Sequence, residues 1–107
     1  MALRVADNPG KSRFEIFDAA EEVGAEEVAG FAEYHLYRDQ IAFIHTEVEP
    51  RFGGRGLGGA LARAALDAAR ERKLAVLPFC PFIRAWIGKH PEYVDLVPEG
   101  ERPRFGF

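Results

Sequence analysis

Five glycines occur within the seven residues 53–59, and Arg51 and Arg55 place two cations in the same loop. Glycine lets a loop turn tightly and leaves its backbone N–H groups accessible. An apolar, strand-like stretch at 41–48 precedes the loop, and an alanine-rich helix follows it. Because the N-terminus of a helix carries a partial positive charge, this arrangement is typical of an anion-binding cradle, above all for phosphate. The alternative is a glycine-rich connection that binds nothing.

Two familiar phosphate loops fit the sequence poorly. The P-loop needs Lys followed by Ser or Thr after its last glycine, whereas Gly58 is followed by Gly59 and Ala60. The dinucleotide fingerprint belongs at the first strand–helix crossover, with an acidic residue about 20 positions further on. Here the loop lies mid-chain and residues 78–80 are Pro-Phe-Cys, which disfavours a nicotinamide-dependent enzyme. The remaining common design is a loop for the pyrophosphate of coenzyme A.

At this loop the sequence resembles the GCN5-related N-acetyltransferases, whose signature between a strand and a helix is Gln/Arg-x-x-Gly-x-Gly/Ala. Gly56-Leu57-Gly58 align with the Gly-x-Gly part, and Gly53 stands where the family usually has Gln or Arg. Three further motifs, at 45–48, 78–82 and 90–93, resemble a subgroup of small single-domain members of about this length. The resemblance covers roughly residues 13–97.

The resemblance implies an α+β fold in which antiparallel strands lead into a parallel β-loop-α-β crossover. The two parallel strands would splay apart, with helices packed on the sheet. Acetyl-CoA would bind with its pantetheine between the splayed strands, against the backbone of Glu47 and Val48. Its pyrophosphate would lie on the glycine loop, for which the expected cofactor-binding residues are Gly53, Gly54, Arg55, Gly56, Leu57, Gly58 and Gly59.

The expected activity is transfer of an acetyl group from acetyl-CoA to an amine, either a small amine or a lysine side chain. The chain is much shorter than a typical acetyltransferase, and the segment that usually folds over the acceptor is missing or minimal. A second hypothesis is therefore a module that binds CoA or acetyl-CoA with little or no catalysis.

Four side chains are candidates for the chemistry, which needs a base for the amine proton and a group that stabilises the oxyanion or the departing thiolate. His45 and Glu47 alternate onto one face of an otherwise apolar strand, where polar groups need partners or a cavity. Either is a candidate base, although His45 is equally a satisfied core histidine. Cys80 is expected at a helix N-terminus, which favours its thiolate, as an acetyl relay or as a small buried hydrophobe. The resemblance makes Tyr93 a candidate proton donor to the thiolate.

Hydrophobic periodicity predicts the elements that position these residues. Strands are expected at 13–18, 28–38, 41–48 and 74–79. Helices are expected at 57–72 and 82–89, with Pro81 in the first turn of the second helix. A last short element is expected at 93–97, and residues 99–107 are expected to form a loose tail. The predicted inward faces are Leu57, Leu61, Ala64, Ala65 and Ala68 on the first helix and Phe82, Ile83, Trp86 and Ile87 on the second.

Length and composition predict one domain spanning residues 1–107, because 107 residues suffice for a single core. The single cysteine excludes an internal disulfide and fits a reducing cytoplasm. The N-terminus is charged and lacks an apolar signal segment, and the longest apolar run, 74–83, is too short to cross a bilayer. We therefore expect a cytoplasmic protein with no membrane partner and no metal site.

The net charge of −3 is distributed unevenly along the chain. Residues 1–50 hold eleven acids against four Lys or Arg, whereas residues 51–107 hold six acids against ten. Because no overall basic excess exists, a nucleic-acid partner is not expected. Six acids and no Lys or Arg lie from Asp18 to Glu33. If they lie at the acceptor mouth they would attract a cationic amine; the alternative is an ordinary solvated hairpin.

Overall fold

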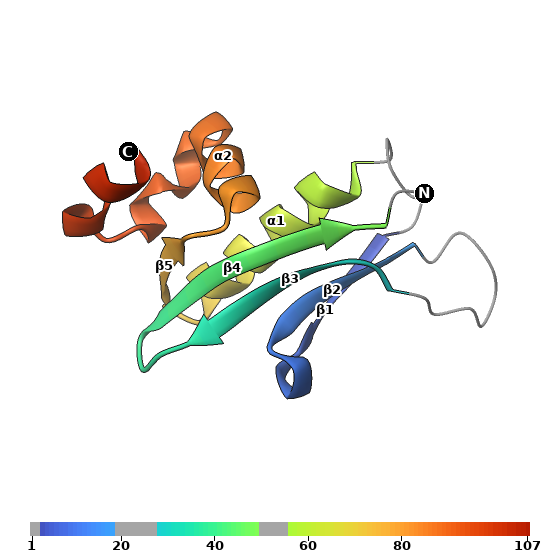
Figure 1. The fold of residues 1–107 in the computed structure, drawn as a ribbon. Helices are drawn as coiled ribbons and strands as arrows, with labels where there is room; N and C mark the ends of the chain where they lie inside the picture. The colour runs from blue at the N-terminus through green and yellow to red at the C-terminus, as the bar shows by residue number, and fades with distance from the viewer. Residues whose placement is uncertain (1–2, 19–27, 50–55) are drawn as a thin grey trace.

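A computed structural model describes residues 3–18, 28–49 and 56–107 of the chain (Figure 1). One five-stranded sheet has the order β1-β2-β3-β4-β5, antiparallel from β1 to β4 and parallel between β4 and β5. Its strands are β1 Leu3–Asn8, β2 Arg13–Asp18, β3 Val28–Leu36, β4 Gln40–Val48 and β5 Ala75–Pro78. The predicted α+β fold with a parallel crossover is confirmed. The turn that the sequence predicts at residues 18–24, after the strand at 13–18, lies almost entirely outside the described residues.

The inner face of the sheet packs on helix α1, Leu57–Glu71, which lies behind the strands in Figure 1. Phe14 and Ile16 alternate onto this face from β2. The buried residues of α1 are Leu57, Leu61, Ala62, Ala65, Leu66 and Ala69. The predicted stripe was wrong at Ala64, which is only half-buried, whereas Ala68 is partly buried and packs against the core. Alanine is so frequent on this helix that hydrophobicity alone cannot place the centre of its buried face.

Helix α2, Pro81–Lys89, packs beside α1 at the β5 edge, with Ile83, Trp86 and Ile87 buried. Phe82 was expected inside but is 41 % exposed. A Cβ placed on Gly58 would lie 2.8 Å from the Phe82 ring. Phe82 therefore lies over the first turn of α1 rather than in the core.

Residues 99–107 were predicted to form a loose tail, and this was wrong. Three short 3₁₀ turns follow α2, and they are η3 Pro91–Leu96, η4 Glu99–Glu101 and η5 Pro103–Phe105. Phe105 is 6 % exposed, and the Phe107 N–H donates to the carbonyl of Arg102 at 2.8 Å. η3 overlaps the short element predicted at 93–97, whereas η4 and η5 were missed because turns this short have no hydrophobic period.

Strand β1 was missed, since the predicted core began near residue 13. All six of its residues pair with β2. The Tyr34 hydroxyl, on β3, donates to Asp7, and Arg72, the residue after α1, lies 3.4 Å from the same carboxylate. Burial first, and then the hydrogen bond with Asp7, raises the pKa of Tyr34 to about 12. These contacts fasten β1 to the rest of the domain.

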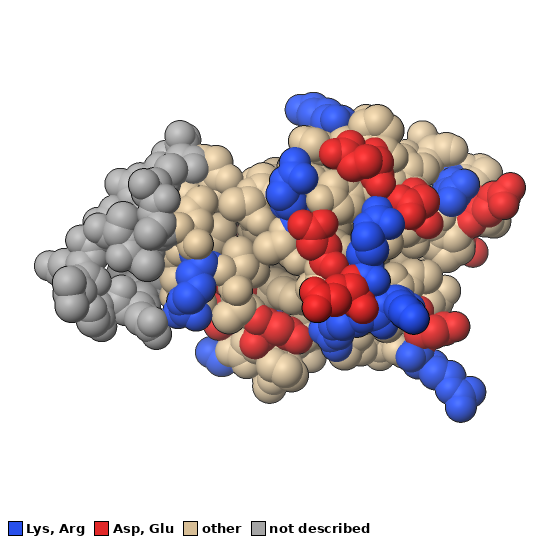
Figure 2. Space-filling model, turned by 180° about the vertical axis from the view of Figure 1, so that it is seen from behind, with Lys and Arg blue, Asp and Glu red and all other residues tan. Residues whose placement is uncertain are grey.

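Charges of both signs intermingle on the face that carries α1 (Figure 2). Among the helices of the described residues, none is long and apolar enough to cross a membrane.

Candidate functional site

Strands β4 and β5 run side by side for only part of their course. Their pairing joins Gln40–Phe43 to Ala75–Pro78, and one more bond runs from the Cys80 N–H to the Phe43 carbonyl at 2.8 Å. Pro78 and Pro81 have no N–H to extend this ladder. β4 nevertheless continues to Val48, still paired with β3 on its other edge. Along residues 44–48, no described strand covers the β5-side edge of β4, and the two strands form a fork.

A β-bulge lies where β4 leaves β5. On β3, the consecutive residues Glu33 and Tyr34 face His45 and Phe43, so Ile44 is an extra residue on β4. Bulges bend a strand and break the simple alternation of its side chains. Strict alternation would put His45 on the buried face with Phe43, whereas the bulge turns it to the opposite face.

His45 and Glu47 consequently project from the open face of the sheet. Their side chains are 50 % and 62 % exposed, and His45 Nε2 lies 3.1 Å from Glu47 Oε1. The His45 ring also lies 6.2 Å from the ring of Phe31, on the neighbouring strand. The prediction that His45 and Glu47 share one face is confirmed. A core role for His45 is excluded, because its polar ring is half exposed.

The same bulge turns Thr46 toward the other side, where it meets Cys80 across the fork. Thr46 Oγ1 lies 3.2 Å from Cys80 Sγ. Cys80 is 2 % exposed and is the N-cap residue of α2, as its position in the sequence suggested. It therefore lies at the closed end of the fork, on the opposite side of β4 from His45 and Glu47.

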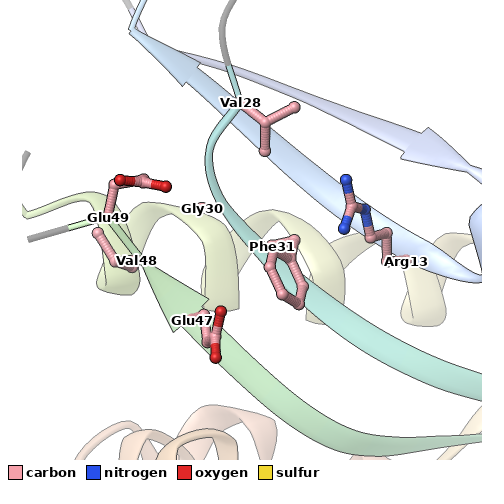
Figure 3. A pocket seen from close by; sticks show the side chains of 7 residues that line it. All are labelled: Arg13, Val28, Gly30, Phe31, Glu47, Val48 and Glu49. Atoms are coloured by element: carbon pink, nitrogen blue, oxygen red, sulfur yellow. The ribbon is translucent and has the colours of Figure 1, made fainter.

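A cavity of about 490 Å³ opens beside Glu47, on the face of the sheet turned away from α1 (Figure 3). Its lining comes from three strands and the residue after β4, and consists of Arg13, Val28, Gly30, Phe31, Glu47, Val48 and Glu49. Sequence reasoning found only Glu47 and Val48. The signal for Phe31 was available in principle, because it is the direct cross-strand partner of Glu47 once the register is known.

Helix α1 begins next to the open end of the fork. Gly56 caps it with a left-handed backbone (φ +73°), a conformation that costs glycine little. Ala60 donates the first helical bond, to the Gly56 carbonyl at 3.1 Å. The N–H groups of Leu57, Gly58 and Gly59 therefore have no partner within the helix. The first turn contains no acidic residue.

The expected loop residues divide into two groups. Gly53, Gly54 and Arg55 lie outside the described residues. Leu57 is buried, so that only its backbone is available to a ligand. Packing favours glycine at position 58, because a side chain there would clash with Phe82.

The profile of the GCN5-related N-acetyl-transferase family matches residues 13–96, which is most of the chain. The chain belongs to this family. A GCN5-like protein from Staphylococcus aureus, solved by NMR, has a TM-score of 0.64 and 25 % identity, over 88 % of this chain and 86 % of that one. The ribosomal-protein-S18-alanine N-acetyltransferase from Escherichia coli has a TM-score of 0.51 and 23 % identity, over 60 % of this chain and 38 % of that one, and shows the shared fold. No curated protein sequence matches the chain.

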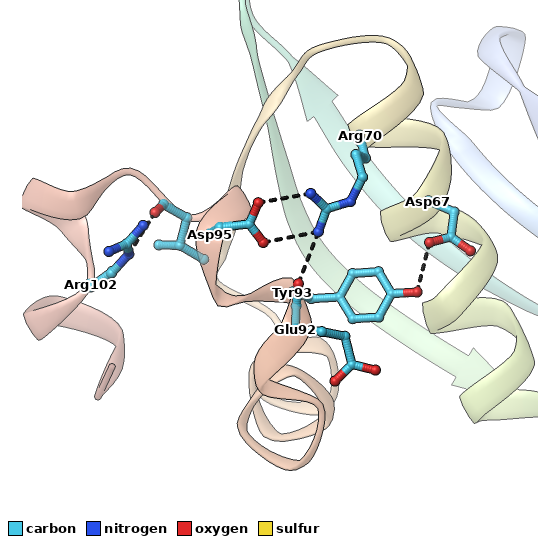
Figure 4. Close-up of polar contacts among 7 residues, drawn as sticks. Asp67, Arg70, Glu92, Tyr93, Asp95 and Arg102 are labelled. Carbon is cyan, nitrogen blue, oxygen red and sulfur yellow. Dashed lines mark hydrogen bonds and ion pairs between the residues drawn. The ribbon is translucent and has the colours of Figure 1, made fainter.

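The structure does not bring Tyr93 of this GCN5-related protein together with the other three candidates. Its hydroxyl donates to Asp67 Oδ1 at 2.7 Å (Figure 4) and accepts from Arg63 Nη1 at 3.2 Å, and both partners lie on α1. Burial first, and then the hydrogen bond to Asp67, raises the pKa of Tyr93. Nearby, Arg70 makes a bidentate ion pair with Asp95, at 2.8 and 2.9 Å. These contacts fasten η3 to α1.

Proposed function

We propose that this chain is an acetyl-CoA-dependent N-acetyltransferase acting on an amine. The observation that carries the proposal is the fork between β4 and β5. It presents a strand edge with no described strand partner, which runs from the Thr46–Cys80 contact toward the free N–H groups at the start of α1. Family membership supports acetyl transfer in general, and the fork supports a place for the donor.

The residues present fit coenzyme A. Its pantetheine arm is a thin chain with two amides, and an open strand edge binds such a chain through backbone hydrogen bonds with little demand on side chains. The backbone of residues 44–48, including Glu47 and Val48, supplies that edge. The N–H groups of Leu57, Gly58 and Gly59 supply donors for a pyrophosphate, and no acid in the first turn opposes it. Gly53, Gly54 and Arg55 complete the proposed cradle from outside the described residues.

When bound, acetyl-CoA supplies an activated acetyl thioester. In this proposal Glu47 accepts the proton that an ammonium group must lose before it can attack, and His45 orients the Glu47 carboxylate through their 3.1 Å contact. Cys80 is buried at the fork end with Thr46 as its polar partner, where it contributes shape. We favour direct transfer to the amine over a relay through Cys80.

One observation favours the alternative of a CoA-binding module. Tyr93, the candidate donor to the departing thiolate, is held on α1 by Asp67 and Arg63. A protein that kept the fork and lacked a proton donor would bind the coenzyme and turn over slowly. The two functions share one binding site and differ in kcat.

The test combines binding with turnover. Calorimetry with CoA measures occupancy of the fork, and release of free thiol from acetyl-CoA, with and without a panel of amines, measures transfer. Binding with amine-dependent thiol release supports the transferase, and binding without it supports the module. Absence of CoA binding by the folded protein would overturn both.

Two finer points belong to the same proposal. A cytoplasmic location agrees with the use of acetyl-CoA and with a free buried cysteine. A cationic acceptor was predicted from the acids between Asp18 and Glu33. Most of those acids lie outside the described residues, so the described part of the chain must supply its own evidence on the acceptor.

A further inference from the structure

We infer that the cavity beside Gly30 is the acceptor site, and that it selects an aliphatic amine carrying a second positive charge, which Glu49 recognises. The inference rests on the proposed function, and it concerns a different face of β4 from the fork. Four observations support it. They are the position of the cavity, its lining, its charge, and a Glu49 side chain without a bonded partner among the described residues.

The cavity lies against the same stretch of β4 that borders the fork. Glu47 and Val48 line it, and both belong to the part of the strand that β5 does not cover. Neighbouring strands lie only about 4.8 Å apart, so a group in this cavity is within one strand width of the edge where the acetyl donor is proposed to lie. An amine bound beside Glu47 could therefore reach across the strand edge.

The walls suit an aliphatic chain. Phe31 and Val28 provide apolar surface, and Gly30 provides a floor without a side chain (Figure 3). A Cβ on Gly30 would lie 2.8 Å from the Glu47 carbonyl oxygen and 3.1 Å from Val48 Cγ2. β3 and β4 thus approach closely here. A volume of about 490 Å³ accommodates a chain of several methylene groups.

Among the described residues that line the cavity the charge is negative, because the one cation there, Arg13, is already neutralised. Arg13 donates from Nε to Glu15 Oε2 at 2.8 Å, and its Nη2 lies 2.8 Å from the same oxygen. The guanidinium also lies over the Phe31 ring, 4.5 Å from its centroid. Glu15 is buried, so this pair is well shielded. Glu47 and Glu49 are left as two carboxylates that no cation among the described lining residues neutralises.

Those two carboxylates differ in their partners. Glu47 faces His45. The Glu49 side chain has no bonded partner among the described residues, while its backbone N–H donates to the Ala29 carbonyl at 2.8 Å and fixes the residue at the rim. A diamine with one end at Glu47 would present its second ammonium group to Glu49.

The test uses three amines of equal chain length, which are pentylamine, cadaverine and 5-aminovalerate. Their far ends are apolar, cationic and anionic. Because Glu49 would bind the second ammonium group, kcat/KM for cadaverine should exceed that for pentylamine by about tenfold at low salt. Glu49→Gln should reduce this ratio to below about threefold. Glu71→Gln, which makes the same charge change on α1, should leave the ratio as it is.

A second readout keeps the inference separate from the proposed function. NMR titration of the CoA-loaded protein with cadaverine should shift the amides of Gly30, Phe31 and Glu49, whether or not transfer occurs. Those shifts without any acetylation would support the cavity and contradict the transferase. Acetylation with equal kcat/KM for the three amines would overturn the inference alone. A preference for 5-aminovalerate would also overturn it, because Arg13 would then be recognising a carboxylate.

Discussion

The two halves of β4 belong to one strand but differ in strand pairing and in burial. The residues of the first half that are paired on both edges, with β3 and with β5, are Ile41, Ala42 and Phe43, and all three are buried. Residues 44–48 keep β3 as a neighbour and have no described strand on the other edge. In this second half His45 and Glu47 project from the open face, and Thr46 meets Cys80.

Two local features separate the halves. The extra residue Ile44 bends β4 where the pairing with β5 ends, and Pro78 ends the ladder from the β5 side. The first half should therefore determine stability, and the second half should determine binding and catalysis. Substitutions in each half can break or sharpen this division.

The largest expected effect is on stability, in the paired half. Phe43→Ala removes a fully buried ring that packs on Phe14, and should reduce the free energy of unfolding by about 3–5 kcal/mol. Urea denaturation measures the loss. The Phe43→Ala protein that stays folded at low temperature should bind CoA with the same affinity as the parent protein. A variant with normal stability and impaired CoA binding would contradict the division.

The next largest effect is on catalysis, in the unpaired half. Glu47→Gln keeps the shape of the side chain and removes the base, so kcat should fall by about 100-fold. Stability should change by less than about 0.5 kcal/mol, because the side chain is mostly exposed. Steady-state kinetics and thermal denaturation check both values. A kcat within about threefold of the parent, alongside normal CoA binding, would exclude Glu47 as the base.

Binding at the start of α1 is tested by Gly59→Asp. A Cβ there would lie at an ordinary 3.5 Å from Trp86 Nε1, whereas Gly58 is unsuitable because Phe82 occupies its space. An acid in the first turn favours the helix but repels a pyrophosphate, so CoA affinity should fall by about tenfold while stability holds or rises. Gly59→Asn has the same shape without the charge and is the matched control. Equal CoA affinities of these two variants would refute the pyrophosphate placement.

Tyr93→Phe should affect stability more than chemistry. Loss of the hydrogen bond to Asp67 should cost about 1 kcal/mol, with kcat little changed. The folded state raises the pKa of Tyr93, so its stabilising contribution is complete below the ordinary value of 10.0 and is lost as pH rises through the folded-state value. The stability difference between the two proteins should therefore be constant near neutral pH and shrink in strong alkali. A large fall in kcat would instead support the proton-donor role.

The smallest expected effect is that of Cys80→Ala on turnover. If Cys80 lines the fork without reacting, the variant should retain most of the parent kcat, and mass spectrometry of the parent with acetyl-CoA alone should show no acetylated protein. One added acetyl group on the parent, absent from the variant, would establish the relay.

Much of the fold could be predicted, because it depends on patterns that sequence displays. Alternation placed β2 correctly, and the crossover followed from an apolar strand, a glycine loop and an alanine-rich helix. β1 was missed although Leu3 and Val5 alternate and Pro9-Gly10 follows as a turn signal. It is a short edge strand that is only half-buried, so its pattern is weak.

The candidate site could be predicted only where it lies on one element. His45 and Glu47 lie on β4 and Cys80 follows β5, so strand assignments located them. Thr46 was not singled out, because its contact with Cys80 joins two elements. Phe31 and Arg13 line the cavity because of the register in which three strands pair. The nearby turn residues do not determine that register, so these two residues could not be predicted. The bulge at Ile44 was invisible because nothing in the residue types marks it, although it decides which face His45 occupies.

The bulge also determines how the protein would tolerate deletion of a single residue from β4. In a regular strand, deletion of one residue turns every later side chain to the opposite face and is destructive. Deletion of Ile44 would instead restore regular pairing, with His45 still opposite Glu33 and Glu47 still opposite Phe31. The sheet should survive, while β4 would straighten and lie closer to the course of β5. Deletion of Ile44 would thus leave folding intact and narrow the fork. Any selection against the deletion would therefore act only through impaired ligand binding.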